Sequence, residues 1–591
     1  MYQYTDFDRQ FVRTRAAQYR DQLGRFLEGT LSNDEFLPLR LQNGWYVQRY
    51  APMLRVAVPY GELASRQLRV LAQIAREYDQ PSAEVYRTAT STQAAFGTEN
   101  MPTGYGHFTT RQNVQFNWIP LAKSADVMDL LASVNMHGIQ TSGNCIRNIT
   151  SDERAGIAVD ELVDPRPFCE IVRQWSTLHP EFAFLPRKFK IAISGALEDR
   201  AATSWHDVGL HVLRNEAGEI GFKVLVGGGM GRTPVIASTI RDFLPWQEVL
   251  NYIEAVVRVY NRWGRRDNKY KARIKILVKA EGQRFVDEVE TEYQQIVSVD
   301  GAPHTITQAE LDRVSASFVP PALVAPAQEA TKNVAPSLSA EDEIIYARWL
   351  KQNVAPHKNP ALRAVTLSFK RLGHAPGDAT AEQLDTAAEL ADQFSAGEVR
   401  VTHDQNLLLP WVRADQLPAL WRAARKAGFA KSNIRLLTDM IACPGGDFCA
   451  LANARSIPIA EAITERYQDM DELFDIGEID LHISGCINSC GHHHSGHIGI
   501  LGVDKDGREW YQISLGGSDG STLSGPPVAG KVVGPSFGAL EVPDVIEALL
   551  DTYRRERLNG ETFIDTVRRI GMDTFKQAAN SVRHTAEAEL V

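Results

Sequence analysis

Four of the six cysteines form two close pairs, and this spacing limits what the chain can fold into more than any other feature. The first pair reads Cys443-Pro-Gly-Gly-Asp-Phe-Cys449, and the second reads Cys486-Ile-Asn-Ser-Cys490. Thiolates are soft ligands that suit iron–sulfur clusters, and glycine-containing loops can wrap a cluster closely. We therefore expect the fold to bring these two distant loops to one point and hold a cluster there.

Two other interpretations of the cysteines stay open from spacing alone. Structural zinc ligands usually lie two to four residues apart, which suits Cys486 and Cys490 but not the first pair. Buried, inert thiols are the second alternative, because free cysteine is among the most buried residue types. Cys145 and Cys169 stand alone, and we predict that they line the core or a pocket.

The chain reads as two similar halves joined by a linker rich in Pro, Ala and Ser between Ser317 and Glu341. In the first half Trp118 follows Gln112-Asn113 by five residues, and in the second Trp411 follows Gln405-Asn406 by the same offset. Hydrophobic periodicity predicts strands and helices in the same order in both halves. The predicted helices cover residues 65–78, 125–136, 381–394 and 415–427, with alternating residues at 107–118 and a strand at 399–402.

Two local patterns refine this description. Thr380 with Gln383 three residues later predicts a capping box at the start of the helix over 381–394. Residues 81–104 are polar, small and aperiodic, which predicts a mobile surface loop without helix or strand.

Composition excludes several classes of protein. With 591 residues the chain is long enough for three or more compact units. The net charge of −10 argues against a general nucleic-acid binder, so an anion site has to be built locally. No apolar run is long enough to span a membrane, and the N-terminus has no signal pattern. We expect a cytoplasmic protein without a membrane anchor.

The segments Ala442-Cys-Pro-Gly-Gly-Asp-Phe-Cys449 and Ser484-Gly-Cys-Ile-Asn-Ser-Cys-Gly491 resemble the cofactor-binding motif of siroheme and 4Fe-4S sulfite and nitrite reductases, closest to the assimilatory bacterial sulfite reductase hemoprotein. The resemblance covers almost the whole chain, from about Leu39 to Phe575. It implies an α+β fold, internally duplicated, with ferredoxin-like half-domains and two α/β siroheme-reductase domains. The expected units are a half-domain over 1–140 with the mobile loop 81–104, a siroheme-reductase-like domain over 141–316, the linker 317–342, a half-domain over 343–432 and the 4Fe-4S/siroheme domain over 433–591.

The resemblance also implies roles for single residues. Cys490 is expected to bridge the cluster and the siroheme iron, while Cys443, Cys449 and Cys486 hold the remaining irons. Four cations of the first half are expected to face the open side of that iron, where fixed positive charge binds an oxyanion and stabilises the oxygen that leaves as water. They are Arg111, Arg147, Lys188 and Lys190.

Further residues are expected around the siroheme carboxylates. The glycine run Gly227, Gly228 and Gly229 does not fit a dinucleotide loop and is assigned to the siroheme. The other expected siroheme contacts are Arg187, Gln115, Lys271 and Arg273. A solvated helix face explains the basic run over 265–273 equally well. The imidazoles of His492, His493, His494 and His497 depart from the family pattern and are expected to form pocket wall or surface, with adventitious metal binding as the alternative.

The implied reaction is the six-electron reduction of sulfite to sulfide, with reduction of nitrite to ammonia on the same cofactors as the alternative. The chain carries no flavin or nicotinamide domain, so electrons are expected from a ferredoxin or a separate flavoprotein. A non-catalytic redox sensor is a more distant hypothesis, which the anion pocket does not favour.

Overall fold

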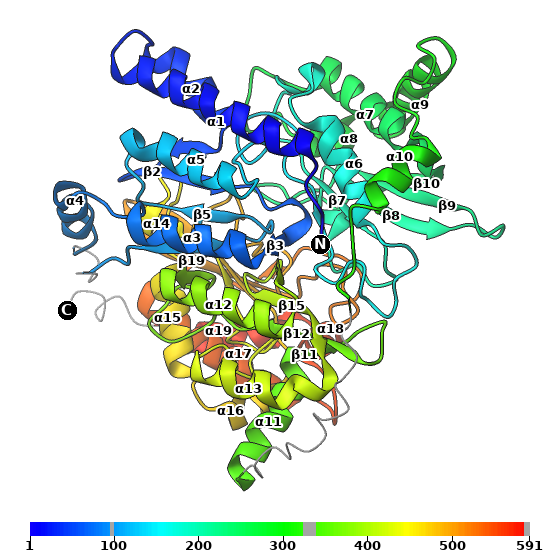
Figure 1. The fold of residues 1–591 in the computed structure, drawn as a ribbon. Coiled ribbons are helices and arrows are strands. Elements are labelled where there is room, and N and C mark those ends of the chain that lie inside the picture. The colour runs from blue at the N-terminus through cyan, green and yellow to red at the C-terminus, as the bar shows by residue number, and fades with distance from the viewer. Residues whose placement is uncertain (95–99, 323–338, 584–591) are drawn as a thin grey trace, which may run out of the picture.

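The computed structural model describes residues 1–94, 100–322 and 339–583 (Figure 1). Two antiparallel sheets form the half-domains, in the strand orders β1-β2-β5-β4-β13 and β11-β12-β15-β14-β3. The strands of the first are β1 Trp45–Val47, β2 Pro52–Val56, β4 Tyr105–Phe108, β5 Val114–Phe116 and β13 Asp378–Thr380. The strands of the second are β3 Glu62–Ala64, β11 Val354–Pro356, β12 Leu362–Leu367, β14 Glu398–Val401 and β15 Leu407–Arg413.

The two half-domains exchange strands. β13 of the second half pairs with β4, with Asp378 opposite His107. β3 of the first half pairs with β14, with Leu63 opposite Val399. One continuous buried core therefore serves both half-domains, and each sheet is completed by the other half of the chain.

Helices α3 (Ser65–Glu77) and α12 (Ala381–Phe394) pack against each other at the centre of this pair, as Figure 1 shows. Ion pairs Arg69–Asp392 and Arg76–Asp385, both at 2.5 Å, join their exposed flanks. The helices predicted over 65–78 and 381–394 are confirmed. The predicted capping box is confirmed as well, because the Thr380 hydroxyl accepts from the Gln383 backbone N–H and the Gln383 side chain accepts from that of Thr380.

The repeated Gln-Asn motif makes equivalent contacts in the two halves. Gln112 and Gln405 both have positive φ, at 58° and 62°, in the turn that precedes a strand. The Gln112 side chain accepts from the backbone N–H of Ser151 and donates to the carbonyl of Val401. The Gln405 side chain accepts from the N–H of Ala442 and donates to the carbonyl of Phe108. Each glutamine thus ties its half-domain to the other half-domain and to one of the two remaining sheets.

Those remaining sheets have the same pairing pattern. In each, two short strands lie parallel to the third strand of the sheet, and the later strands are antiparallel. The third sheet contains β6 Thr150–Ser151, β7 Ile191–Ser194, β8 Val208–Arg214, β9 Ile220–Val226 and β10 Ser238–Pro245. The fourth contains β16 Ile441–Ala442, β17 Leu481–Ser484, β18 Ile498–Lys505, β19 Arg508–Leu515, β20 Lys531–Val532 and β21 Phe537–Gly538. This duplication agrees with the expected α+β architecture.

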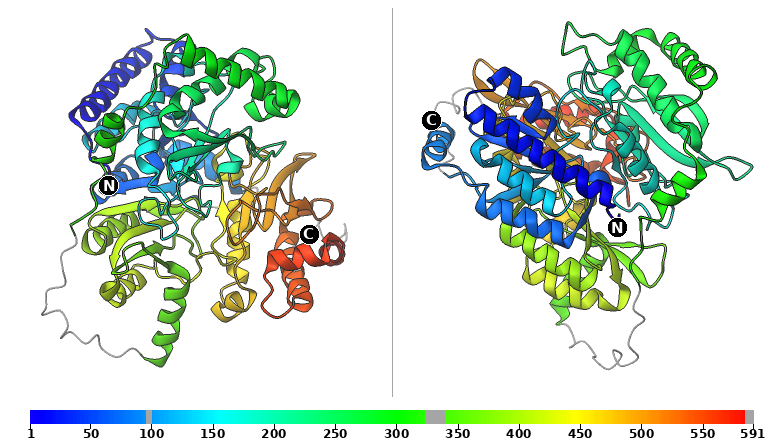
Figure 2. Two further views of the ribbon diagram at one scale, coloured as in Figure 1. Left: turned by 90° about the vertical axis from the view of Figure 1, so that its right-hand side faces the viewer. Right: turned by 45° about the horizontal axis from the view of Figure 1, so that its top comes forward.

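Helices cover the four sheets, and the third and fourth sheets each have a separate core (Figure 2). The half-domains carry α1 Asp6–Leu27, α2 Asn33–Gln42, α5 Ser124–Ser133, α11 Ala340–Asn353 and α13 Leu417–Lys426. The third sheet is covered by α6 Arg166–Ser176, α7 Val249–Trp263, α8 Ile274–Glu281, α9 Gln283–Ser298 and α10 Gln308–Ser315. The fourth has α14 Gly445–Phe448, α15 Ile457–Arg466, α16 Met470–Ile476, α17 Val542–Glu556, α18 Phe563–Ile570 and α19 Met572–Ser581. No helix in the described ranges combines the length and apolar character needed to cross a membrane.

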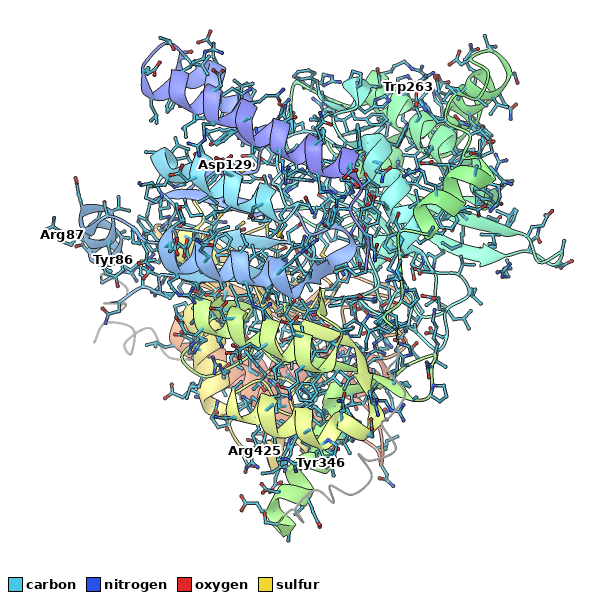
Figure 3. The ribbon with its side chains drawn as sticks, in the orientation of Figure 1. Tyr86, Arg87, Asp129, Trp263, Tyr346 and Arg425 are labelled. Atoms are coloured by element: carbon cyan, nitrogen blue, oxygen red, sulfur yellow. The ribbon has the colours of Figure 1, made fainter. Side chains whose placement is uncertain are left out.

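The segment 81–104 differs from its prediction. It contains helix α4 (Ala83–Ala94), on which Tyr86 and Arg87 stand at the margin of the molecule (Figure 3). The apolar contacts of α4 are few. Ala89 packs in a small separate cluster with Trp118 and with Phe448 of the first cysteine loop. So short an apolar face gives no clear helical period in the sequence, and the prediction of a loop without helix was wrong. Residues 95–99, and 323–338 of the predicted linker, lie outside the described ranges.

Candidate active site

The two cysteine loops meet at one edge of the fourth sheet. Cys443 directly follows β16, and Cys486 follows β17 after Gly485. Because β16 and β17 are parallel neighbours, their carboxyl ends lie together. Gly485 is required at this meeting point, since a Cβ there would lie 2.5 Å from the Ala454 carbonyl oxygen and 2.7 Å from the Gly445 Cα. The sheet thus assembles the loops that the cysteine spacing predicted would converge.

Backbone N–H groups point at two of the sulfurs. Gly485 N–H donates to Cys443 Sγ at 3.3 Å, and Asn488 N–H donates to Cys486 Sγ at 3.5 Å. Burial raises the pKa of the Cys443 thiol to about 12 and that of Cys486 to about 11, in each case with a contribution from Cys490. Thiolates at these positions therefore need a cation to stabilise them, and the donated N–H groups are of the kind that tunes the potential of a metal–sulfur centre.

The separation of the sulfurs distinguishes a cluster from a single zinc ion. Tetrahedral zinc with bonds of about 2.3 Å places its sulfurs roughly 3.8 Å apart. Among the described residues, the one group of three or more ligand-type side chains whose ligand atoms lie within 4.8 Å of one another contains no cysteine. No three of the four cysteine sulfurs therefore converge as closely as one zinc ion requires.

A basic chamber adjoins Cys490, the exposed member of the four cysteines. Its cavity measures about 140 Å³, and Cys443, Cys490 and His492 form part of the wall. Among the described residues that line it, none is Asp or Glu. Six lining residues are cations of the first half: Arg55, Arg111, Arg147, Lys188, Lys190 and Arg273.

Two of the four predicted arginines, Arg111 and Arg147, donate hydrogen bonds to backbone carbonyls. Arg111 Nη2 donates to the Asn148 carbonyl at 2.6 Å, while its buried Nη1 has no partner in the described structure. Burial lowers the pKa of Arg111 to about 9. Arg147 donates to the carbonyls of Thr141 and Gly143, at 2.7 Å from Nη1 and from Nη2. Since neither guanidinium forms an ion pair with a described carboxylate, both keep charge available to an anion.

Lys188 and Lys190 come directly before strand β7 and enter the same chamber. Neither ammonium group donates to a residue in the described ranges. Burial lowers the pKa of Lys188 to about 8, with Cys490 opposing and Arg147 adding to the shift. The pKa of Lys190 falls well below its usual value because of burial and the nearby Arg111. Lys188 can therefore exchange a proton near neutral pH. A bound anion would favour the charged forms of both lysines.

The remaining predicted site residues divide into two groups. Gln115, on β5, lines the chamber and accepts from Arg55 Nη2 at 2.9 Å. Arg273 also lines it, but its guanidinium is paired with the buried Asp207 at 2.7 Å. The glycine loop lies beside Arg273, because a Cβ on Gly229 would be 2.9 Å from Arg273 Nη2. The predicted residues that do not line the chamber are Arg187, Lys271, which is exposed, and Gly227, Gly228 and Gly229.

Sequence reasoning missed Arg55. It lies on β2 between the fully buried Leu54 and Val56, and its Nε has no hydrogen-bond partner among the described residues. A charged side chain within a buried strand was the available signal, because such a group needs a partner or a ligand.

The histidine run does not form a second metal centre. His492 lines the chamber, His494 contacts the Gly231 carbonyl at 2.9 Å, and His497 contacts the Ser524 hydroxyl at 2.9 Å. These imidazoles belong to no group of convergent ligand atoms in the described structure. The expectation of pocket wall thus fits the geometry.

Comparison with known families agrees with this geometry. Residues 142–297 and 435–585 match the nitrite and sulphite reductase 4Fe-4S domain, and residues 366–427 match the nitrite/sulfite reductase ferredoxin-like half domain. The chain belongs to the nitrite and sulfite reductase family. The two 4Fe-4S matches contain the third and fourth sheets, so the duplication covers both halves of this reductase. The resemblance found in the cysteine motifs is confirmed, and siroheme and a 4Fe-4S cluster are the cofactors of this oxidoreductase.

Curated relatives carry both substrate names. The chain is 28% identical over 554 residues to the assimilatory ferredoxin-dependent nitrite reductase of Haloferax mediterranei, covering 91% of this chain and 85% of the relative. It is 27% identical over 523 residues to sulfite reductase [ferredoxin] 1 of Mycolicibacterium paratuberculosis, covering 86% and 81%. The solved structure of the Mycobacterium tuberculosis NirA protein has the same fold, with a TM-score of 0.70, 24% identity and 92% of each chain covered.

Proposed function

We propose that this reductase converts sulfite to sulfide, with electrons supplied by a ferredoxin. The observation that carries the proposal is the chamber beside Cys490, which is lined by six basic residues and by no acidic residue in the described ranges. Five of the six have no carboxylate partner among the described residues, and Arg273 is paired with Asp207. Sulfite is a dianion with three oxygens at neutral to alkaline pH, whereas nitrite is a monoanion with two. Electrostatic attraction grows with the charge of the anion. A strongly cationic chamber therefore favours sulfite over nitrite.

The cofactors fit the residues present. Cys443, Cys449, Cys486 and Cys490 offer four thiolates to a cluster, and we assign Cys490, the exposed cysteine on the chamber wall, to both the cluster and the siroheme. When bound, the cluster and the siroheme supply single electrons and an iron that binds substrate. We assign Gln115, Arg187 and Arg273, with the loop at Gly227, Gly228 and Gly229, to the siroheme periphery. Lys271 is exposed and has the weakest case among these assignments.

The protein's own residues bind the anion and deliver protons. Reduction of sulfite to hydrosulfide consumes six electrons and seven protons and releases three waters. In this proposal Arg111 and Arg147, with the added Arg55, bind and orient the oxyanion through guanidinium N–H groups. Lys188 and Lys190 are the proton donors, because both line the chamber and burial lowers the pKa of each below its usual value. A non-catalytic redox sensor would have no need for this arrangement.

A ferredoxin is the proposed donor because the relatives described above are named as ferredoxin-dependent enzymes. The test compares kcat/KM for sulfite and for nitrite with reduced viologen as the donor, and then compares turnover with reduced ferredoxin and with a reduced flavoprotein. We expect a value at least tenfold higher for sulfite, with sulfide as the product, and faster turnover with ferredoxin than with a flavoprotein donor. A higher kcat/KM for nitrite would overturn the assignment and make the chain a nitrite reductase.

A further inference from the structure

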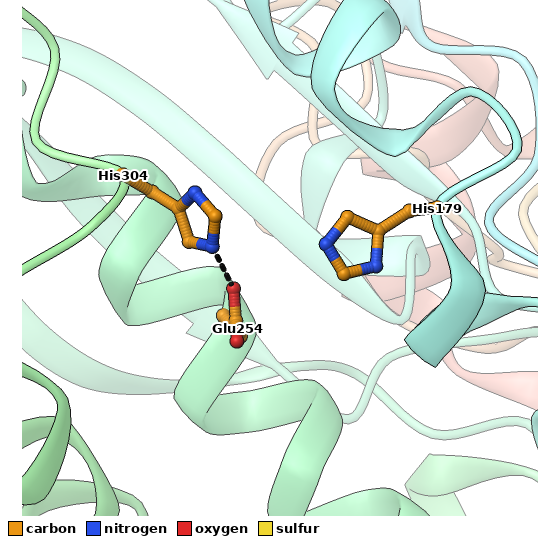
Figure 4. A group of neighbouring side chains, drawn as sticks. All are labelled: His179, Glu254 and His304. Carbon is orange, nitrogen blue, oxygen red and sulfur yellow. Dashed lines mark ion pairs between the residues drawn. The ribbon is translucent and has the colours of Figure 1, made fainter. Parts of the chain in front are cut away.

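Three potential metal ligands converge in the domain built on the third sheet, outside the basic chamber. His179, Glu254 and His304 each bring one ligand atom within 4.8 Å of the other two, and no other such group occurs within the described ranges. Figure 4 shows a ring nitrogen of each histidine directed toward the Glu254 carboxylate. His179 immediately precedes a short 3-10 helix, Glu254 lies on α7, and His304 lies between α9 and α10. Three separate segments therefore meet at one point.

The Glu254 carboxylate is positioned as a ligand. Its side chain is 4% exposed, and Oε1 accepts from Arg258 Nη2 at 2.6 Å. Oε2 lies 2.6 Å from His304 Nε2 but takes part in no hydrogen bond with the described residues. A buried carboxylate oxygen whose close polar neighbour is an imidazole nitrogen outside hydrogen-bond geometry is a group that a cation would satisfy.

The charged groups around the site have a net negative charge, which a dication would offset. Arg258 contacts two further carboxylates, at 3.1 Å and 3.0 Å, and Arg262 shares one of them and contacts another. Two guanidinium groups thus face four carboxylates, a net charge of −2 if both histidines are neutral. The four carboxylates are Glu254, Glu288, Glu292 and Asp300.

We propose that His179, Glu254 and His304 bind a zinc ion. Two imidazoles and one carboxylate are a ligand set that zinc accepts, with a remaining position for water. The two histidines are only partly buried, so water can reach that position. Ligation places the ring proton of His179 on Nδ1, so the 3.2 Å contact of that atom with the Glu181 N–H is given up.

The ion would restrain the segment that leads to Lys188 and Lys190, the proposed proton donors. His179 stacks on Phe182 with ring centroids 4.1 Å apart, and six residues after Phe182 the chain reaches Lys188. A metal bond from His179 to α7 and to the α9–α10 segment would fix the start of that stretch. The proposed role is structural, because the site lies apart from the residues that line the chamber.

The experiment is a zinc titration of the holoprotein after removal of loosely bound metal with a chelator. Equilibrium dialysis with zinc chloride, followed by elemental analysis, gives the zinc bound per chain in addition to iron. The variants are His304→Ala and Glu254→Gln, the second of which keeps the size of the side chain. His211→Ala is the matched control, since His211 faces Asp199 at 3.6 Å with similar exposure but has no second histidine.

We expect one zinc per chain in the wild type and in His211→Ala, with affinity at least tenfold weaker in His304→Ala and in Glu254→Gln. Zinc should also raise the thermal unfolding midpoint of the wild type but not that of these two variants. Equal zinc affinity in wild type and His304→Ala, or no zinc retained by the wild type, would overturn the proposal. Unchanged siroheme absorption in each variant shows that the comparison is between folded proteins.

Discussion

The two copies of the 4Fe-4S domain share a strand pairing pattern but place their chemistry at opposite ends of the equivalent strands. In the first copy, Arg147 comes shortly before β6 and Lys190 directly before β7. In the second, Cys443 comes directly after β16 and Cys486 shortly after β17. Asp152 and Gly195 occupy the positions after β6 and β7, so the first copy has no cysteine there. The two copies thus share a common frame, and their loops differ, because those of the first copy carry the chamber cations and those of the second carry the four cysteines.

Hydrogen bonds across the chamber join the turn that carries Arg111 to the second half of the chain. Thr110, beside Arg111, donates to the Cys490 carbonyl at 3.0 Å. His403 of the second half contacts the carbonyls of Thr110 and Ser151 at 3.1 Å and 3.0 Å. The turn that carries Arg111 is therefore held by the half that carries the four paired cysteines, which fixes Arg111 relative to Cys490.

The largest effect is expected from Cys490→Ser. This change removes the thiolate assigned to both cofactors, so the siroheme absorption bands and turnover should both be lost. The measurement is the optical spectrum together with iron and acid-labile sulfide assays. Cys169→Ala is the control, because Cys169 is a buried cysteine of the first copy that should leave the spectrum unchanged. A normal siroheme spectrum in Cys490→Ser would refute the assignment of the cofactors to the second copy.

Lys188→Ala and Lys190→Ala should keep both cofactors and lose turnover by about a hundredfold or more, as expected for the loss of a proton donor. Here the measurement is kcat and kcat/KM for sulfite beside the optical spectrum. Lys279→Ala changes an exposed lysine of the same copy and should retain full activity. Full activity in either chamber variant would remove that lysine from the catalytic assignment.

A moderate effect on turnover is expected from a change in pH. Because Lys188 donates a proton only while charged, and burial lowers its pKa to about 8, turnover should fall as pH rises through about 8. Lys188→Arg keeps the charge at high pH and should move this decline to higher pH while lowering the maximal rate. The pH profile of kcat in both proteins is the measurement, and an identical decline in Lys188→Arg would contradict the role of Lys188.

The smallest effect is on the stability of the half-domains and leaves the reaction unchanged. Thr380 caps α12 with its side chain, whereas the equivalent helix α3 begins after Ala64, which has no hydroxyl. Thr380→Ala should lower the free energy of unfolding by about 1 kcal/mol, measured by denaturant titration, with activity unchanged. A loss well above that value would mean that Thr380 also supports the strand exchange at β13.

The sequence alone determined the elements and the chemistry. The cysteine spacing indicated a cluster, the period of residues 381–394 predicted α12 with its cap, and the repeated Gln-Asn motif indicated duplication. These predictions succeeded because helix period, capping and ligand type depend on residues close together in the chain. The motif resemblance gave the family and the four chamber cations, since motifs carry their residue types with them.

Only the tertiary structure decided which residues meet. The exchange of β3 and β13 between half-domains, the place of Arg55 in the chamber and the convergence of His179 with His304 all join segments far apart in sequence. Helix α4 packs in one apolar cluster with Phe448, more than 350 residues away. The physical reason is the same in each case: burial and charge balance are set by neighbours in space, and local sequence patterns carry no record of those neighbours.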